Sequence, residues 1–236
     1  MFYYLFEYLE NTYQLPGAGV FQYISFRAAL AVITSLLVSM VFGGRIINLI
    51  RNRQIGEEVR SLGLAGEDAK TGTPTMGGLI ILAAIFIPTL LFAKLDNIYV
   101  IIMLISTVWL GTIGFLDDYI KVFKKDKSGL AGRFKILGQV GLGLIVGVTL
   151  YFHDGITIKE KIDLPISLET KQVFGEEIKS TKTTIPFVKN NEFDYEIALS
   201  WMGEKATSLT WIVFILMVIF VVTAVSNGAN MTDGLD

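Results

Sequence analysis

Residues 97–121 read NIYVIIMLISTVWLGTIGFLDDYIK, and this stretch decides the fold. Its first 20 residues contain no Asp, Glu, Lys or Arg, and the paired acids Asp117 and Asp118 follow directly. A helix needs about 20 apolar residues to cross a bilayer core of about 30 Å. The residues do not alternate between apolar and polar, as those of a membrane β-barrel strand would. The stretch therefore predicts a membrane-spanning helix with two carboxylates at one end.

Four more stretches of the 236-residue chain lack these charged residues: 28–44, 71–93, 136–153 and 206–232. Only 18% of all residues are charged and 52% are hydrophobic, whereas a soluble domain has about 25% charged residues. This composition excludes a soluble enzyme, a disordered chain, a collagen and a coiled coil. We predict an all-α polytopic membrane protein with five spans. The predicted spans are about Tyr23–Phe42, Met76–Ala93, Asn97–Leu116, Ile136–Phe152 and Leu209–Val225.

The distribution of Lys and Arg predicts the orientation of these spans. The segments between the first and second spans and between the third and fourth carry eleven basic residues. The segment before Arg27 carries none, and the segment between the second and third spans has only Lys94. Short cytoplasmic loops are enriched in Lys and Arg. The N-terminus, an amphipathic segment at the interface, should therefore lie outside. The end of the fifth span should be cytoplasmic.

Residues 153–208 form the long polar segment between the last two spans. Long segments cross membranes largely regardless of charge, so we place this one outside. The sequences YFHDGITI and TTIPFV indicate short strands. We predict a small external β-rich insertion within a single integral membrane domain covering residues 1–236. The net charge of −2 provides no basic field for nucleic acid, so no nucleic-acid partner is expected.

The sequence KTGTPTMGG, residues 70–78, precedes the second predicted span. Thr73 is a suitable N-cap, and Pro74 suits the first turn of a helix. A helix N-terminus attracts phosphate through its free N–H groups, and Lys70 would add a positive charge. The alternative interpretation is a capped helix whose two glycines, residues 77 and 78, serve only close packing between helices.

The sequence GFLDDYIK, residues 114–121, ends the third predicted span. Carboxylates near the C-terminal end of a helix are unfavourable unless a cation offsets them. Lys121 can do this at four residues from Asp117, and Mg²⁺ bound by carboxylates and substrate phosphates would do it better. The alternative interpretation is a solvated helix end without a metal.

The sequence SNGANMTDGLD, residues 226–236, follows the fifth predicted span. Gly228 is expected to close the helix, after which amides, a hydroxyl and carboxylates crowd together. The alternative is a simple turn rich in Asn, Gly and Asp. All three motifs fall on the predicted cytoplasmic side. Together they suit phosphoryl transfer, which depends mainly on positioning and charge stabilisation.

These three motifs resemble the signature loops of the phospho-N-acetylmuramoyl-pentapeptide transferases, the MraY family. The resemblance implies an enzyme of the bacterial plasma membrane that requires Mg²⁺. Its substrates would be UDP-N-acetylmuramoyl-pentapeptide and undecaprenyl phosphate, and its products lipid I and UMP. The resemblance also implies a homodimer. Alternatives are a polyprenyl-phosphate N-acetylglucosaminyl-1-phosphate transferase and an inactive truncated fragment.

The resemblance also implies roles for individual residues. Asp117 is expected to deprotonate or orient the lipid phosphate. The expected catalytic residues are Asp117, Asp118 and Asp233. The expected substrate-binding residues are Lys70, Thr75, Lys121, Asn227 and Asn230, and the expected Mg²⁺ ligands are Asp118, Asp233 and Asp236. The family continues for several more spans, so the chain resembles its N-terminal portion. Residues 153–208 exceed the family's usual hairpin in length.

Overall fold

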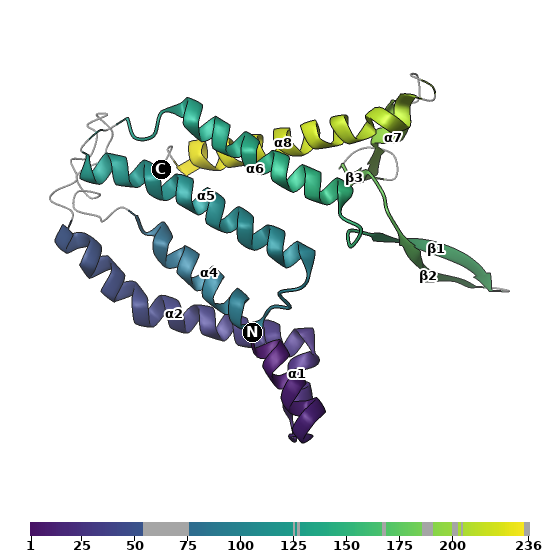
Figure 1. The fold of residues 1–236 in the computed structure, drawn as a ribbon, viewed down its shortest axis with the longest axis horizontal. Helices are drawn as coiled ribbons and strands as arrows, with labels where there is room; N and C mark the ends of the chain where they lie inside the picture. Colours follow the sequence, from purple (N-terminus) through teal and green to yellow (C-terminus); the bar gives the residue numbers. More distant parts are fainter. Residues whose placement is uncertain are drawn as a thin grey trace. The chain divides into compact units, whose positions relative to one another are not determined.

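The computed structural model describes residues 1–53, 76–124, 126, 128–166, 169–185, 191–199, 203 and 205–233. The fold is mostly helical, with two small antiparallel sheets (Figure 1). The chain forms two compact units, Met1–Lys135 and Ile136–Asp236. The boundary falls within helix α6 (Gly132–Phe152), after its first turn. The predicted site residues are therefore divided between the two units.

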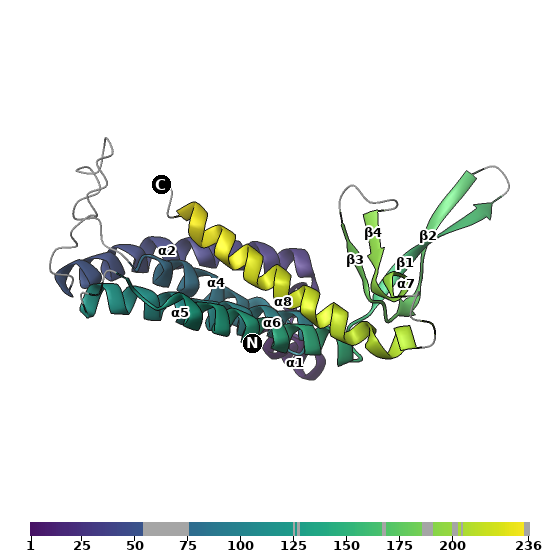
Figure 2. The same ribbon diagram turned by 90° about the horizontal axis from the view of Figure 1, so that it is seen from above.

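The first unit consists of helices only. Its elements are α1 (Phe2–Tyr13), the 3₁₀ helix η1 (Ala18–Gln22), α2 (Ile24–Arg53), α4 (Gly78–Phe92), α5 (Ile98–Phe123) and the first turn of α6. Helix α4 packs against α2 on one side and against α5 on the other (Figures 1 and 2). The amphipathic N-terminal segment forms helix α1.

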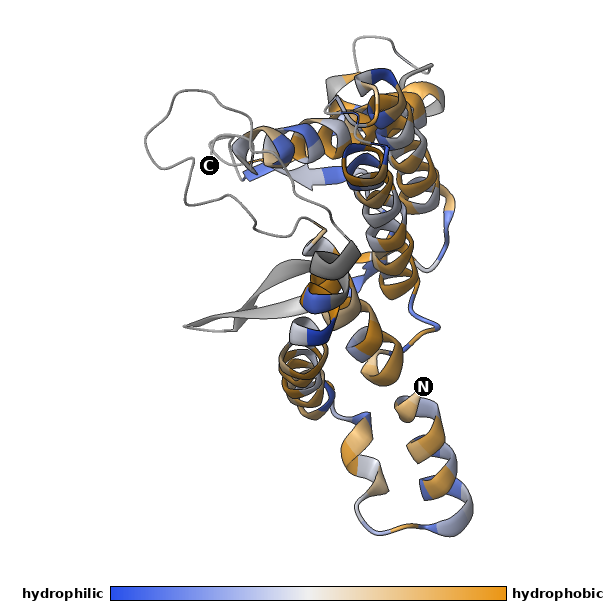
Figure 3. Ribbon diagram, turned by 90° about the vertical axis from the view of Figure 1, so that its left-hand side faces the viewer, coloured by the Kyte–Doolittle hydropathy of each residue, from blue (hydrophilic) through white to orange (hydrophobic). Residues whose placement is uncertain are grey.

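Four helices are long and apolar enough to cross a membrane: Ile24–Asn48, Ile98–Phe123, Gly132–Phe152 and Leu209–Thr232. They correspond to four of the five predicted spans. Apolar residues occupy most of their length (Figure 3), and many large apolar side chains on them are exposed, as lipid-facing residues would be. The long apolar stretches therefore predicted these four helices correctly.

The second predicted span is shorter than expected. Helix α4 has 15 residues, which gives a length of about 22 Å at 1.5 Å per residue. This falls below the bilayer core of about 30 Å. The helix begins at Gly78, with Gly77 as its N-cap, and not at Pro74. Thr73 and Pro74 lie outside the described residues.

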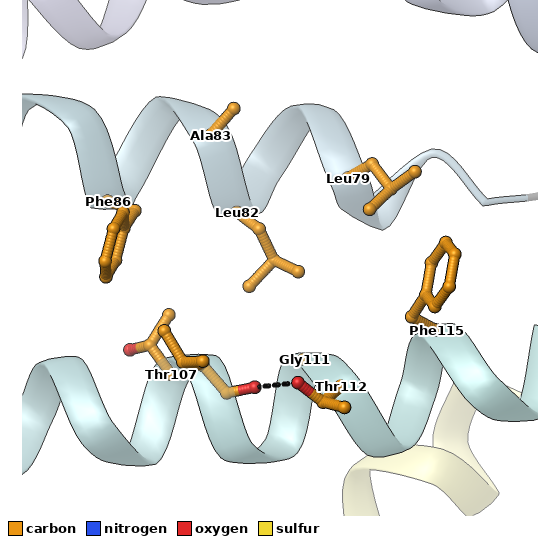
Figure 4. Close-up of a pocket in the computed structure, with 9 residues that line it drawn as sticks. Leu79, Leu82, Ala83, Phe86, Thr107, Gly111, Thr112 and Phe115 are labelled. Carbon is orange, nitrogen blue, oxygen red and sulfur yellow. Dashed lines mark hydrogen bonds between the residues drawn. The ribbon is translucent and has the colours of Figure 1, made fainter.

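The two glycines at the start of α4 make no close contact among the described residues. A Cβ atom added to Gly77 or Gly78 would meet no atom within 4 Å in the described part of the chain. The packing alternative for this motif stays a prediction. Farther along, α4 and α5 line an open pocket of about 300 Å³ with an apolar lining (Figure 4).

Helix α1 is fixed to the end of α4 by aromatic and charged contacts. The Arg27 guanidinium donates a hydrogen bond to the carbonyl of Phe92 (3.0 Å) and lies over the ring of Tyr3. The Tyr4 hydroxyl donates to Asp96 (2.7 Å). Because Arg27 bonds a carbonyl at the end of α4, it offsets the negative end of that helix. Arg27, a residue of α2, thus links α1 and α4.

The second unit combines two helices with two hairpins. After α6, strand β1 (Ile158–Ile166) pairs with β2 (Glu169–Ile178), and β3 (Lys182–Thr184) pairs with β4 (Glu192–Asp194). A short helix α7 (Tyr195–Ala198) and the long α8 (Lys205–Asp233) follow. Strands are thus confirmed within 153–208. The expected strand at 151–158 is wrong, because α6 continues to Phe152 and β1 begins only at Ile158.

Helices α6 and α8 pack closely through small residues. A Cβ atom at Gly143 would lie 2.7 Å from the Cα atom of Ile219, and one at Gly147 would lie 3.3 Å from the Cα atom of Ile215. Tyr195 is buried against Phe214 of α8 and so fixes the β3–β4 segment to the helix pair. In membranes, small residues allow helix backbones to approach in this way.

Candidate active site

Asp117 is the centre of a charged cluster at the C-terminal end of α5. The residue is buried, with 7% of its surface exposed. Its Oδ2 atom lies 2.7 Å from Nζ of Lys121, and its Oδ1 atom lies 2.9 Å from Nζ of Lys135. Oδ1 also accepts a hydrogen bond from the Leu130 N–H (2.8 Å). The predicted pairing of Asp117 with Lys121 is confirmed, and a second lysine joins it.

The connection between α5 and α6 is shaped to reach this carboxylate. Helix α5 ends at Phe123, and the Asp126 carboxylate then accepts from the N–H (3.0 Å) and the hydroxyl (2.6 Å) of Ser128. Gly129 follows with a φ of +65°, a conformation that favours glycine. A Cβ atom there would run into Oδ1 of Asp117. The turn therefore brings the Leu130 N–H onto Asp117.

Asp118 points in a different direction from Asp117. Adjacent residues of an α-helix are rotated by about 100° from each other, and Asp118 is half-buried. The two acids therefore differ in surroundings, although the sequence presents them as a pair. Asp117 is held by two ammonium groups and a backbone N–H. This occupation of both its oxygens makes Asp117 an unsuitable metal ligand in this arrangement.

Residues 226–233 of the third motif are helical, because α8 continues through Gly228 to Asp233. The predictions that Gly228 closes the helix, or that a turn begins there, are therefore wrong. One glycine inside a helix costs only about 1 kcal/mol, and α8 continues in spite of it. The Thr232 hydroxyl donates to the Gly228 carbonyl (3.0 Å) within the helix. The motif thus presents its side chains with helical spacing.

Asn227 and Asn230 have different environments on α8. The Asn227 amide donates to Oε1 of Gln139 in α6 (2.8 Å) and to the carbonyl of Thr223 (2.9 Å). Asn230 is exposed. Of the two asparagines predicted to bind substrate, Asn227 joins two helices and Asn230 has an accessible surface.

Several predicted site residues have no described side-chain position. Lys70, Thr75 and Asp236 lie outside the described residues, and Asp233 is described only as the last residue of α8. In the described part of the chain, no group of three or more His, Cys, Asp or Glu side chains could hold a metal ion. Of the three predicted Mg²⁺ ligands, only Asp118 has a described side chain. The Mg²⁺ site stays a prediction.

Three positions that contribute to these clusters were not singled out from the sequence. Lys135 counted only as one basic residue among eleven, and Gly129 and Gln139 were not considered. A useful signal existed for Gln139, because it is an amide within an apolar helix and a buried amide requires a partner. For Lys135, nothing in the spacing of 18 residues from Asp117 indicates contact.

Comparison with known proteins extends these observations. The profile described as glycosyl transferase family 4 matches residues 100–236, more than half of the chain. The chain belongs to glycosyl transferase family 4. The phospho-N-acetylmuramoyl-pentapeptide-transferase signature 1 matches residues 70–82, which places the chain in the MraY group. The family match contains Asp117, Lys135, Gln139 and Asn227, and the signature contains Lys70 and Thr75.

Relatives in this family agree with that assignment. The chain is 57% identical over 241 residues to the phospho-N-acetylmuramoyl-pentapeptide-transferase of Flavobacterium psychrophilum. It is 60% identical over 238 residues to the protein of that name from Parabacteroides distasonis. These matches cover 100% of this chain and 59% and 57% of the relatives, respectively. The chain thus spans less than three fifths of the length of either relative.

Proposed function

We propose that this chain serves the transfer of phospho-N-acetylmuramoyl-pentapeptide from its UDP-activated form to undecaprenyl phosphate, giving lipid I and UMP. The observation that carries the proposal is the Asp117 cluster, in which one buried carboxylate holds two lysines at the end of a candidate membrane span. It lies within the family match. The signature at residues 70–82 favours the muramoyl-pentapeptide donor over UDP-N-acetylglucosamine.

In this proposal Asp117 positions cations and does not act as a base. A phosphate monoester has a second pKa near 6, so the lipid phosphate is already largely ionised at neutral pH. Asp117 would have to release Lys121 or Lys135 before it could take up a proton. Lys121 is 40% exposed on its side chain, and an ammonium has three donors. It can therefore donate to a phosphate oxygen while it remains paired with Asp117.

A divalent ion is expected to complete the site. Mg²⁺ would neutralise charge on the transferred diphosphate, and Asp118, Asp233 and Asp236 are the proposed residues to hold it. Asp117 is not among them, and its oxygens accept from Lys121, Lys135 and the Leu130 N–H. Asn230, exposed on α8, is the proposed amide contact to the sugar nucleotide.

The proposal includes a topology in the bacterial inner membrane. We propose that α4 is a fifth span, that the N-terminus lies outside and that the end of α5 faces the cytoplasm. The sequence contains no cysteine, so single cysteines can report the side of the membrane. A cysteine at Asp154 should react with an impermeant maleimide in intact cells, and one at Asn230 should react only after lysis. Reaction of both in intact cells would contradict the topology.

The activity is tested with the product of the whole gene. Membranes containing it should release UMP from UDP-N-acetylmuramoyl-pentapeptide when undecaprenyl phosphate and Mg²⁺ are supplied, and should prefer this donor to UDP-N-acetylglucosamine. Asp117→Asn and Asp118→Asn should each lower the rate at least about 100-fold, as expected for essential positioning groups. Asp154→Asn, at an exposed acid, is the matched control and should keep the rate. Full activity in both site variants would refute the assignment.

A further inference from the structure

A pair of amides, Gln139 and Asn227, joins α6 to α8 within the second unit. Gln139 is 5% exposed in α6, a candidate span whose first turn carries Arg133 and Lys135, and Asn227 is half-buried. Its Nε2 atom donates to Oγ of Ser226 (3.0 Å) and to Oδ1 of Asn227 (3.4 Å). In return, Nδ2 of Asn227 donates to Oε1 of Gln139 (2.8 Å) and to the carbonyl of Thr223 (2.9 Å). All four side-chain N–H donors of the two amides are therefore used.

The two amides depend on this pairing. A polar group in an apolar environment is costly without a hydrogen bond, and Gln139 is 5% exposed. The amides meet only when α8 presents Asn227 towards α6. Close contact of Gly143 with Ile219 leaves little space for side chains between the two helices. The amide pair thus fixes the rotation of α8 about its axis, whereas apolar contacts alone tolerate several rotations.

This rotation has a consequence for the last turns of α8. Asn230 follows Asn227 at three residues, so the direction in which Asn227 points sets the direction of Asn230. Asn227 is engaged with Gln139, and Asn230 is exposed. Within the third motif, Asn227 therefore holds the helix against α6, and Asn230 is presented at the surface of the helix.

We propose that Gln139 is a positioning residue that acts through Asn227 to set the rotation of α8 and thereby to orient the end of the third motif. The expected effect of Gln139 on turnover rests on the proposed function. The proposal assigns Asn227, expected from its motif to bind substrate, to the same positioning role. The effect of Gln139 on the orientation of α8 does not depend on any activity.

The orientation is measured first, by spin labels in the product of the whole gene. Leu137 of α6 and Met231 of α8 are both exposed, residues 1–236 contain no cysteine, and any cysteine elsewhere in the gene product is replaced by serine first. Cysteines introduced there should give one narrow distance distribution in the otherwise unchanged protein. Gln139→Leu and the double variant Gln139→Leu/Asn227→Leu should broaden or shift it. Thr149→Val is the matched control, because the Thr149 hydroxyl bonds only within its own helix.

Turnover and thermal stability then separate positioning from simple stabilisation. A single Leu variant leaves the partner amide unpaired, whereas the double variant removes both amides, which is often nearly neutral for stability. The double variant should therefore regain thermal stability but keep a turnover at least tenfold below that of the unchanged protein. The exchange variant Gln139→Asn/Asn227→Gln, which retains both amides, should recover a narrow distribution and part of the turnover.

Two results would overturn the proposal. One is a double Leu variant with an unchanged distance distribution, and the other is a double Leu variant with full turnover. If the unchanged protein gave no UMP with either sugar donor, the proposed function would fail instead. The distance distributions would still decide whether Gln139 orients α8.

Discussion

The C-terminal parts of α5 and α8 are fixed by different chemistry. On α5, a buried carboxylate is held by two lysines and a loop N–H. On α8, a neutral amide is held by another amide in the neighbouring helix. Charged groups are expensive inside a bilayer, so the partners of Asp117 come from the end of its own helix and from the connection that follows. Neutral amides can pair between the helices themselves.

This difference indicates that the Asp117 cluster and the amide pair have different tasks. The charged cluster keeps cations at a helix end where a phosphate can reach them, and its parts can rearrange when a substrate arrives. The amide pair has no spare N–H donor and is enclosed by the two helices, so it suits a fixed orientation. Variants that remove charge should therefore affect chemistry most, and variants at the amide contact should affect orientation most.

The largest effect on stability is expected from the lysines around Asp117. Lys135→Met should destabilise the protein by about 2–3 kcal/mol, below the usual cost of breaking a fully buried ion pair because Asp117 retains Lys121. Lys121→Met should cost less, because its side chain is 40% exposed against 23% for Lys135. Thermal unfolding in detergent measures both values.

The matched control for these lysines is Lys179→Met. Lys179 pairs with the fully exposed Asp154 at 3.7 Å, and exposed pairs contribute little. Its loss should leave the unfolding temperature unchanged. Equal losses from Lys135→Met and Lys179→Met would mean that burial of Asp117 does not strengthen its ion pairs.

A smaller effect is expected from the turn that closes over Asp117. Gly129→Ala should cost about 1–2 kcal/mol for the left-handed backbone alone. The new methyl group would also displace the Asp117 carboxylate, so activity should fall further than stability. Gly132→Ala is the matched control, because a Cβ atom there meets nothing within 4 Å. An active Gly129→Ala variant would show that the loop N–H is not needed on Asp117.

Alanine substitutions at the α6 glycines that contact α8 should cost more stability where the contact is closer. Gly143→Ala places a methyl group 2.7 Å from the backbone of Ile219 and should cost about 1–3 kcal/mol as overpacking. Gly147→Ala, at 3.3 Å from Ile215, should cost less than half of that. The same thermal unfolding assay ranks the two. A reversed order would contradict the helix register described for α6 and α8.

The smallest effect concerns the pH response of the α5–α6 connection. Hydrogen bonds from the Ser128 hydroxyl and N–H lower the pKa of Asp126 from its ordinary value of 3.8. A lowered pKa means that the turn is fully stabilised above pH 3.8 and loses this contribution as the pH falls through the lower, folded value. The protection factor of the Ser128 amide, which corrects for the intrinsic pH dependence of hydrogen exchange, should therefore fall only below about pH 4. Asp126→Asn should abolish this fall, and an unchanged profile would contradict it.

The apolar stretches by themselves determined where the long helices lie but not where three of them end, because α2, α5 and α8 continue 11, 7 and 8 residues past the predicted ends at 42, 116 and 225. The predicted starts at 23 and 97 and the predicted end at Phe152 agree with α2, α5 and α6 to within one residue. This success has a simple reason, because the length of a charge-free stretch is a local property that the bilayer selects. The pairing of Asp117 with Lys121 was equally predictable, since it depends only on helical spacing.

Only the tertiary structure decided which side chains meet across elements. Lys135 reaches Asp117 because a turn with Gly129 reverses the chain between them, and Asn227 meets Gln139 because α8 continues through its glycine in one rotation beside α6. Such contacts depend on the path of a loop and on the rotation of a helix. Neither is fixed by hydrophobicity or by spacing along the chain, so the sequence revealed the kinds of groups in the site but not their partners.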